Sequence, residues 1–290
     1  NEMCEGMVKA YPQLDYDPKY RIIKRKHGAA AKVSLISGGG SGHEPAHAGF
    51  VGKGMLTAAV CGDVFASPST IQVYNAILQT QSDAGTLLII KNYSGDVMNF
   101  DAAAEMAEEE GIEVRRVYVN DDIAVKDSTY TIGRRGVAGT VFVHKIAGAA
   151  AERDQDIDEV VRIAEKVIRN TKSIGFAFTS CTVPAKGTPT FDIGEDEIEF
   201  GVGIHGEPGI ERCGLQPSKT LADRMCGMLL EEMDLKENDE IAVLINGLGG
   251  TPLMELFVIN NDVRQYLDDK KVVVDRTFVG NYMTSLEMAG

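Results

Sequence analysis

The sequence predicts an α/β protein made of two α/β domains, each a mainly parallel or mixed sheet flanked by helices. Short apolar segments alternate with helical patterns through the first half, and a new apolar segment at 173–179 opens a second series. The length of 290 residues also lies near the size at which single cores stop growing, roughly 250–300 residues. We expect the domains to cover residues 1–171 and 172–290.

The first domain is expected to contain a mostly parallel sheet. Its expected strands are residues 32–36, 55–61, 86–91 and 112–119, and its expected helices are residues 70–80, 100–110, 137–151 and 157–170. Strands that alternate with helices form βαβ units, which place helices on both faces of the sheet. In such sheets ligands bind at the carboxyl ends of the strands, so the loops there are candidate sites.

The second domain is expected to be smaller. Its expected strands are residues 173–179, 198–203, 240–245 and 271–275, and its expected helices are residues 218–233 and 251–267. The sequence begins without Met and ends on Gly290, so we expect the C-terminal domain to be incomplete.

Composition excludes several classes of function. The net charge of −14 argues against a nucleic-acid partner, and the basic cluster Lys24-Arg25-Lys26-His27 is typical of a solvated rim. No segment approaches the ~20 apolar residues that span a bilayer, and we expect a cytoplasmic protein with no membrane partner. The 5 cysteines lack Cys-x-x-Cys spacing, so neither a metal site nor a disulfide framework is indicated.

A glycine-rich segment follows the first expected strand. Residues 37–45 read Ser-Gly-Gly-Gly-Ser-Gly-His-Glu-Pro, which predicts a backbone cradle for a small polar ligand with His43 at its rim. A nucleotide-binding P-loop needs Lys and then Ser or Thr after its last glycine. Here His43, Glu44 and Pro45 stand at those positions, so we do not expect a nucleotide.

A second glycine-rich segment contains His205. Residues 201–206 match the Gly-x-Gly-x-x-Gly pattern, but Glu207-Pro208-Gly209 would break the helix that a dinucleotide site requires. His205 is left among glycines on a loop. It is either an acid, base or nucleophile near neutral pH, or a histidine satisfied by hydrogen bonds within the loop.

Three further groups could carry chemistry. Lys91 and Asp96 close a strand across Ser94-Gly95, where the carboxylate could serve as a base toward a hydroxyl, or the two could form a surface pair at a turn. His47 could share a metal with His43 only in a helix, which Pro45 opposes, so a structural role is favoured. His144 lies on an expected helix, where a packing role is favoured.

Several segments together resemble the dihydroxyacetone kinase family, specifically its substrate-binding K subunit of the phosphotransferase-system-dependent type. The resemblance rests on residues 37–47, 52–57, 61–69, 91–96, 135–140, 203–209 and 281–288. It covers essentially the whole chain. It implies two α/β domains with a pocket near their junction, usually in a homodimer.

The resemblance also implies roles for individual residues. His205 matches the histidine that adds its ring nitrogen to the ketone carbon of dihydroxyacetone to give a hemiaminal. His43 matches the acid/base histidine of that addition, and Asp96 matches the carboxylate that accepts the proton of the hydroxyl attacking phosphorus. Substrate hydrogen bonds are implied for Gly40 and Lys91, and Ser67 is a further candidate.

The resemblance places the phosphoryl donor on another chain. ADP or ATP with Mg is expected on a nucleotide-binding L-type subunit, which a phosphotransferase-system protein recharges, and no cofactor or metal is expected on this chain. Two alternatives remain: a non-catalytic sensor that activates a transcription regulator, and the K domain of an ATP-dependent single-chain kinase. The presence of both His43 and Asp96 favours catalysis, because a sensor needs no base for phosphoryl transfer.

Overall fold

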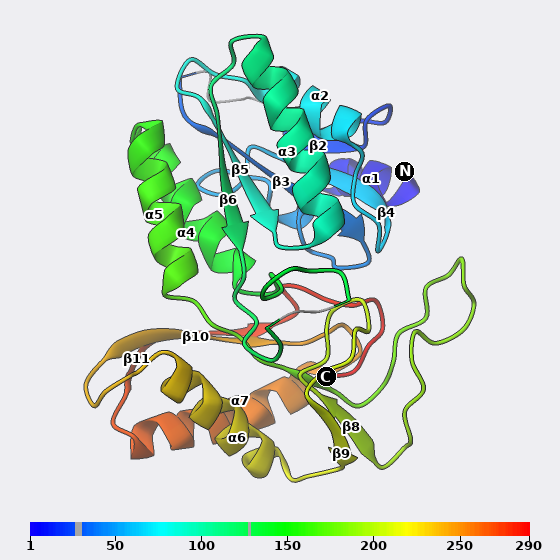
Figure 1. Cartoon of the computed structure of the whole chain (residues 1–290), viewed down its shortest axis with the longest axis vertical. Helices are drawn as coiled ribbons and strands as arrows, with labels where there is room; N and C mark the ends of the chain where they lie inside the picture. The colour runs from blue at the N-terminus through cyan, green and yellow to red at the C-terminus, as the bar shows by residue number, and fades with distance from the viewer. Residues whose placement is uncertain (27–30, 127–128) are drawn as a thin grey trace.

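The computed structural model describes residues 1–26, 31–126 and 129–290. Figure 1 shows a large sheet with helices on both faces, followed along the chain by a second part with smaller sheets and two further helices. The predicted α/β class is confirmed.

The large sheet contains six strands in the order β1-β2-β4-β3-β5-β6. They are β1 (Leu14–Asp17), β2 (Ile22–Arg25), β3 (Ser34–Ser41), β4 (Ala58–Val64), β5 (Thr86–Lys91) and β6 (Val114–Val119). Strands β4, β3, β5 and β6 run parallel, as the βαβ pattern predicts. The edge strands β1 and β2 pair antiparallel and make the sheet mixed. They follow helix α1 (Glu2–Ala10), and the sequence analysis had assigned neither of these strands nor this helix.

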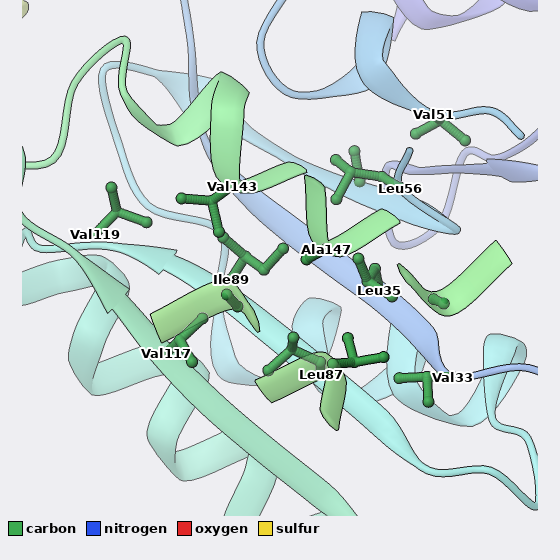
Figure 2. Close-up of a cluster of buried hydrophobic side chains, with 14 of the residues drawn as sticks. Val33, Leu35, Val51, Leu56, Leu87, Ile89, Val117, Val119, Val143 and Ala147 are labelled. Carbon is green, nitrogen blue, oxygen red and sulfur yellow. The ribbon is translucent and has the colours of Figure 1, made fainter. Parts of the chain in front are cut away.

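Helices cover both faces of this sheet. Helices α2 (Thr70–Thr80) and α3 (Ser94–Glu109) bury one face, and α4 (Thr140–Glu152) and α5 (Ile157–Arg169) bury the other. Figure 2 shows Leu35, Leu87 and Ile89 of the sheet packed against Val143 and Ala147 of α4.

The segment that follows β3 crosses one face of the sheet, whereas the segments that follow its neighbours β4 and β5 cross the opposite face. It includes the short 3-10 helix η1 (Ala48–Phe50) and packs in the same core as α4, whereas β4 and β5 continue into α2 and α3 on the opposite face. The carboxyl end of β3 is therefore a topological switch point, which is where open α/β sheets bind ligands.

The glycine-rich segment differs from expectation. Strand β3 extends to Ser41, so Gly38, Gly39 and Gly40 belong to the sheet rather than to a loop. A Cβ at Gly38 would lie 2.5 Å from the carbonyl oxygen of Val60 on β4. Glycine is needed here because neighbouring backbone approaches too closely for a side chain.

The second part contains two small sheets. One is antiparallel, with β7 (Phe176–Ala177), β8 (Glu197–Phe200) and β9 (Glu211–Gly214); the other pairs β10 (Glu240–Asn246) with β11 (Val273–Gly280) in parallel. Helices α6 (Ser218–Glu232) and α7 (Leu253–Asp269) share a core with β10 and β11. Figure 1 places these helices on the side of that sheet away from α4 and α5.

The expected strand 173–179 is reduced to β7. Its flanks pair elsewhere: the N–H of Ser173 donates to the carbonyl of Asp121, and the N–H of Phe178 donates to that of Ala289. The division of the chain at residue 171 stays a prediction.

Two further expectations concern the surface. In the predicted basic cluster, Lys24 donates to Gln79 and Arg25 pairs with Glu152, while His27 lies outside the described residues. Across residues 1–26, 31–126 and 129–290, no helix combines the length and apolar character needed to cross a bilayer.

Candidate active site

The site lies where the carboxyl end of the large sheet meets a loop of the second part. His43 follows β3, Lys91 ends β5, and Asp96 lies in the first turn of α3. His205 reaches them from the loop between β8 and β9, 162 positions after His43. The structure thus brings together the three main residues that the sequence analysis proposed for catalysis.

The imidazoles of His43 and His205 face each other. Their Nε2 atoms are 3.1 Å apart, and the rings meet edge to face at an interplanar angle of 82°. The Nδ1 atom of His43 lies 2.7 Å from the carbonyl oxygen of Thr284, so this nitrogen carries a proton and donates it. Burial lowers the pKa of His43 well below its ordinary value, and the charges of Lys91 and His205 lower it further. Neutral His43 therefore presents a lone pair on Nε2 toward His205.

Glu207 holds the opposite nitrogen of His205. Its Oε1 lies 2.9 Å from Nδ1 of His205, and its Oε2 accepts the backbone N–H of the same residue at 2.9 Å. Burial opposes ionisation of Glu207, but the hydrogen bond and charge of His205 outweigh it and lower its pKa to about 2. The carboxylate accepts, so Nδ1 of His205 carries a proton, and Nε2 is the nitrogen that faces His43.

A single proton between the two Nε2 atoms allows one hydrogen bond between the rings. With no proton two lone pairs would face each other, and with two protons two N–H groups would collide. The arrangement therefore couples the protonation of His43 to that of His205. A histidine satisfied only by bonds within its own loop, the alternative left open by the sequence, does not describe His205, because His43 comes from another element.

Aromatic rings surround the pair. Phe65 stacks on His43 with centroids 5.0 Å apart, and Phe65 and Tyr93 both meet His205 edge to face at 5.1 and 4.8 Å. These rings limit access of water and strengthen electrostatic interactions among the remaining groups.

Lys91 and Asp96 are buried rather than paired at the surface. Lys91 is 1% exposed and Asp96 is 5% exposed. Burial raises the pKa of Asp96, although Lys91 and the Ser67 hydroxyl lower it, and burial also lowers the pKa of Lys91. The alternative of a surface pair at a turn is wrong. Asp96 also lies in a helix rather than at a strand end, because α3 begins at Ser94, earlier than expected.

A space bordered by functional groups lies at Gly39. A Cβ placed there would be 3.6 Å from Oδ2 of Asp96, 3.6 Å from Cε of Lys91 and 3.7 Å from Nε2 of His47. These are ordinary contact distances, so the site has room for about one small group where other residues would carry a side chain.

The other two candidates for substrate binding line the same region. A Cβ at Gly40 would lie 2.6 Å from the backbone nitrogen of Ala66, so close packing alone requires this glycine. The hydroxyl of Ser67 donates to the carbonyl of Pro68 and accepts from Asn99. Their contacts with substrate stay predictions.

His47 lies apart from His43 and pairs with His144. Nδ1 of His47 is 2.9 Å from Nε2 of His144, and both residues are buried. Among the described residues no three His, Cys, Asp or Glu side chains come together as metal ligands.

The sequence analysis missed the residues that hold His43 and His205 in place. Glu207 was visible only as a carboxylate two positions after His205, and the carbonyl of Thr284 has no sequence signature at all. The segment around Thr284 binds both halves of the site: the N–H of Leu286 donates to Gly42, and the hydroxyl of Ser285 donates to Ile204.

A buried ion pair also anchors the loop of His205. Arg135 is 0% exposed, donates from Nε to Asp122 at 2.7 Å, and donates from a terminal nitrogen to the carbonyl of Gly201 at 2.7 Å. Arg135 and Asp122 lie between β6 and α4, so the large sheet helps to place the loop.

Several known proteins are similar to this chain in sequence and in fold. The family model described as the Dak1 domain matches residues 5–290. The chain is 53% identical to the dihydroxyacetone-binding subunit DhaK of the PTS-dependent dihydroxyacetone kinase 1 of Listeria innocua, over 100% of this chain and 88% of that protein. It is 41% identical to the corresponding PEP-dependent subunit of Escherichia coli, with the same coverage.

Solved structures agree. A dihydroxyacetone kinase operon co-activator, Dha-DhaQ, superposes with a TM-score of 0.95 at 40% identity, covering 99% of this chain and 89% of that one. The dihydroxyacetone kinase of C. freundii superposes with a TM-score of 0.91 at 42% identity, covering 99% of this chain and 53% of that one. The resemblance drawn from the motifs is confirmed, and the chain belongs to the Dak1 family of dihydroxyacetone kinases.

Proposed function

We propose that the chain is the dihydroxyacetone-binding subunit of a phosphotransferase-system-dependent dihydroxyacetone kinase. It captures dihydroxyacetone as a hemiaminal on His205 and presents the terminal hydroxyl for phosphorylation to dihydroxyacetone phosphate. The observation that carries this proposal is the facing pair of Nε2 atoms, 3.1 Å apart, with the outer nitrogens held by Glu207 and Thr284.

The capture step follows from this arrangement. The shared proton moves to Nε2 of His43, which frees the lone pair on Nε2 of His205. That lone pair forms a bond to the ketone carbon, and the π electrons of the carbonyl move to its oxygen, which takes the proton from His43. His205 then carries a positive charge beside the carboxylate of Glu207. Glycerol has no carbonyl and cannot form this bond, so the step selects ketones and aldehydes.

The transfer step uses the other half of the site. Asp96 accepts the proton of the terminal hydroxyl while its oxygen bonds to phosphorus, and Lys91 donates a hydrogen bond to a substrate oxygen. The burial that raises the pKa of Asp96 makes it a stronger base than an exposed carboxylate. Transfer should therefore slow as the pH falls through this raised pKa, because only the ionised form accepts a proton.

The donor comes from a partner in this proposal. An L-type subunit carries ADP or ATP with Mg and is recharged by a phosphotransferase-system protein, in line with the PTS-dependent names of the relatives. Two large exposed apolar side chains offer a docking surface beside the site: the ring of Tyr130 lies 6.3 Å from that of His205, and Met98 lies two positions after Asp96 in α3. We place the protein in the cytoplasm as a homodimer, as the family resemblance implies.

A second candidate function is a sensor of dihydroxyacetone that activates a transcription regulator. The TM-score of 0.95 to an operon co-activator favours it. Capture by His205 serves both functions, but phosphoryl transfer alone needs the buried carboxylate of Asp96. The single-chain ATP-dependent kinases are a third arrangement, in which this chain would correspond to about half of the protein, as it does for the Pichia angusta enzyme at 51% coverage.

Reconstitution tests the proposal. The chain is combined with an L-type subunit, the phosphotransferase proteins and phosphoenolpyruvate, and dihydroxyacetone phosphate is measured. His205→Ala should lose both the adduct, seen as added mass, and turnover. Asp96→Asn should keep the adduct but turn over at least ~100-fold more slowly, the usual scale for a lost acid or base.

The outcomes separate the candidates. Full activity of Asp96→Asn would remove the proposed base. Adduct formation without turnover of the wild type, with partners shown to be active on another K subunit, would favour the sensor.

A further inference from the structure

We propose that His47 is a positioning residue for Lys91: in the loaded site its Nε2 accepts a hydrogen bond from the Lys91 ammonium, which leaves Asp96 free to take the substrate proton. The inference rests on the proposed phosphoryl transfer. It starts from the space at Gly39, where Nε2 of His47, Cε of Lys91 and Oδ2 of Asp96 all lie within 3.7 Å of the Cβ position.

Two buried acceptor atoms on the residues that border this space lack partners among the residues that the structure describes. Nε2 of His47 and Oδ1 of Asp96 are buried, and neither has a hydrogen bond within the described part of the chain. Buried polar atoms without partners are rare and costly in folded proteins, and they call for an explanation. One explanation is that these two atoms receive their hydrogen bonds only when substrate is bound.

The contacts on the other side of His47 show which nitrogen carries its proton. The hydroxyl of Ser37 donates its only hydrogen to the carbonyl of Ile89 at 2.6 Å, so its oxygen can only accept from Nδ1 of His47, 3.3 Å away. Nδ1 of His47 therefore carries the proton and donates it to Nε2 of His144 at 2.9 Å. Nε2 of His47 is left with a lone pair directed at the space.

His47 stays neutral in this environment. Burial lowers its pKa well below the ordinary value, and the charges of His144 and Lys91 lower it further. The charged or titratable groups facing it are Lys91 of β5, Asp96 of α3 and His144 of α4, and the charge of His43, which follows β3, also interacts with it. A neutral acceptor next to a buried ammonium is a stable combination, because it satisfies the N–H groups without cancelling the charge.

A count of donors and acceptors assigns the bonds. A substrate hydroxyl has one proton, and Lys91 has three, whereas Asp96 and His47 offer only acceptors. If the hydroxyl accepts from Lys91 and donates to one oxygen of Asp96, Nε2 of His47 is the acceptor that lets a second N–H of Lys91 form a hydrogen bond without an ion pair to the carboxylate. Without this acceptor, Lys91 would turn to Asp96, and a direct ion pair would lower the basicity of the carboxylate.

Two isosteric variants separate this role from a structural one. The amide of His47→Asn reaches the place of Nδ1 and keeps the bond to His144 but loses the acceptor at Nε2. The amide oxygen of His47→Gln reaches the place of Nε2 and keeps that acceptor but loses the bond to His144. A purely structural His47 predicts that the Asn variant is the more active, whereas positioning of Lys91 predicts that the Gln variant is.

The expected results are specific. In the reconstituted assay, kcat of His47→Asn should fall about 10-fold, the scale of one hydrogen bond to a charged group, with KM within about 3-fold of wild type. His47→Gln should keep kcat within about 3-fold. The acid limb of the plot of kcat against pH reports the ionisation of Asp96. It should shift to lower pH in the Asn variant only. The groups around Asp96 are Lys91, Ser67, His47 and His205.

A second measurement needs no partner subunit. Difference infrared spectroscopy of the isolated chain with dihydroxyacetone should show the carboxyl of Asp96 titrating at lower pH in His47→Asn than in wild type and His47→Gln. It tests the role of His47 even if the kinase function fails. Equal titration of Asp96 in all three proteins, or an Asn variant more active than the Gln variant, would overturn the proposal.

Discussion

The molecule holds two pairs of histidines with similar spacing and different surroundings. His43 and His205 approach at 3.1 Å, and His47 and His144 approach at 2.9 Å. In the first pair the outer nitrogens bond to a carbonyl and a carboxylate. In the second pair the outer nitrogens, Nε2 of His47 and Nδ1 of His144, have no partner within the described residues.

The difference shows why the first pair is better suited than the second to the proposed chemistry. Fixed bonds on both outer nitrogens direct the two Nε2 atoms of the first pair at each other, so they compete for one proton. In the second pair a serine fixes one ring, and burial lowers the pKa of both, of His144 to about 3. The first pair can move a proton, whereas the second can only accept or donate a hydrogen bond.

Replacement of Glu207 should have the largest effect on activity. It would remove the carboxylate that holds the outer nitrogen of His205, and within the described residues the outer nitrogens of the second pair lack such a partner. In Glu207→Gln the amide has two orientations. If its oxygen accepts from Nδ1 of His205, its NH2 group faces the backbone N–H, and two donors oppose each other. If its oxygen accepts from the backbone N–H, its NH2 group faces Nδ1, which then carries no proton, so the proton moves to Nε2. Capture of dihydroxyacetone, followed by mass spectrometry, should slow at least ~100-fold. Capture at the wild-type rate would show that the carboxylate does not set the tautomer.

The same variant has a pH signature. The pKa of Glu207 is about 2 in the folded protein against an ordinary 4.5, so its ionised form stabilises the fold above pH 4.5. This contribution is lost as the pH falls from 4.5 toward 2, and Glu207→Gln should therefore lose less stability than wild type on acidification. Urea unfolding at several pH values across this range measures the difference.

The space at Gly39, which His47 of the second pair borders, offers the next test. In Gly39→Ala the added methyl group would make only ordinary contacts with Asp96, Lys91 and His47. The free energy of unfolding should change by less than about 1 kcal/mol, while turnover falls about 30-fold, because displaced reactants lose catalytic geometry. Gly52→Ala is the matched control, since nothing lies within 4 Å of its Cβ position. Normal turnover of Gly39→Ala would place the substrate elsewhere.

The smallest effect on turnover is expected at His144, the member of the second pair that does not border the space at Gly39. His144→Leu keeps a similar volume but leaves Nδ1 of His47 with only the distant oxygen of Ser37. Stability should fall by about 1–2 kcal/mol, the cost of one lost buried hydrogen bond, and thermal unfolding measures it. Turnover should stay within about 3-fold of wild type, and a larger loss would show that His144 is also needed for catalysis.

Much of the fold could be predicted from periodicity. Helix α2 and strand β5 have the bounds that the sequence indicated, since a Ser69–Gln72 cap starts the helix and apolar residues fill the strand. The glycine strand was mistaken for a loop, because its reason is the approach of β4 and not any propensity of its own. Polar edge strands such as β9 gave too weak a pattern.

The site was predicted in its parts but not in its geometry. His43, His205, Lys91 and Asp96 were chosen as candidates because side chains able to carry chemistry stood beside glycines and strand ends, and the structure brings them close together. Their contacts depend on how distant segments pack, so neither the Nε2 pair nor the carbonyl of Thr284 could be derived. Glu207 faces His205 because Gly206 adopts a φ of +81° in the turn between them, a conformation that the sequence alone did not show.

The bond from His43 to Thr284 also bears on the synthesis of the protein. The two residues lie 241 positions apart, so a growing chain can fold its large sheet long before the carbonyl that orients His43 exists. A partly made chain therefore has the glycine-rich strand β3 and His43, but not the carbonyl that orients the imidazole of His43. If His205 captures carbonyl compounds as proposed, the site gains the bond that orients His43 only after translation has passed Thr284.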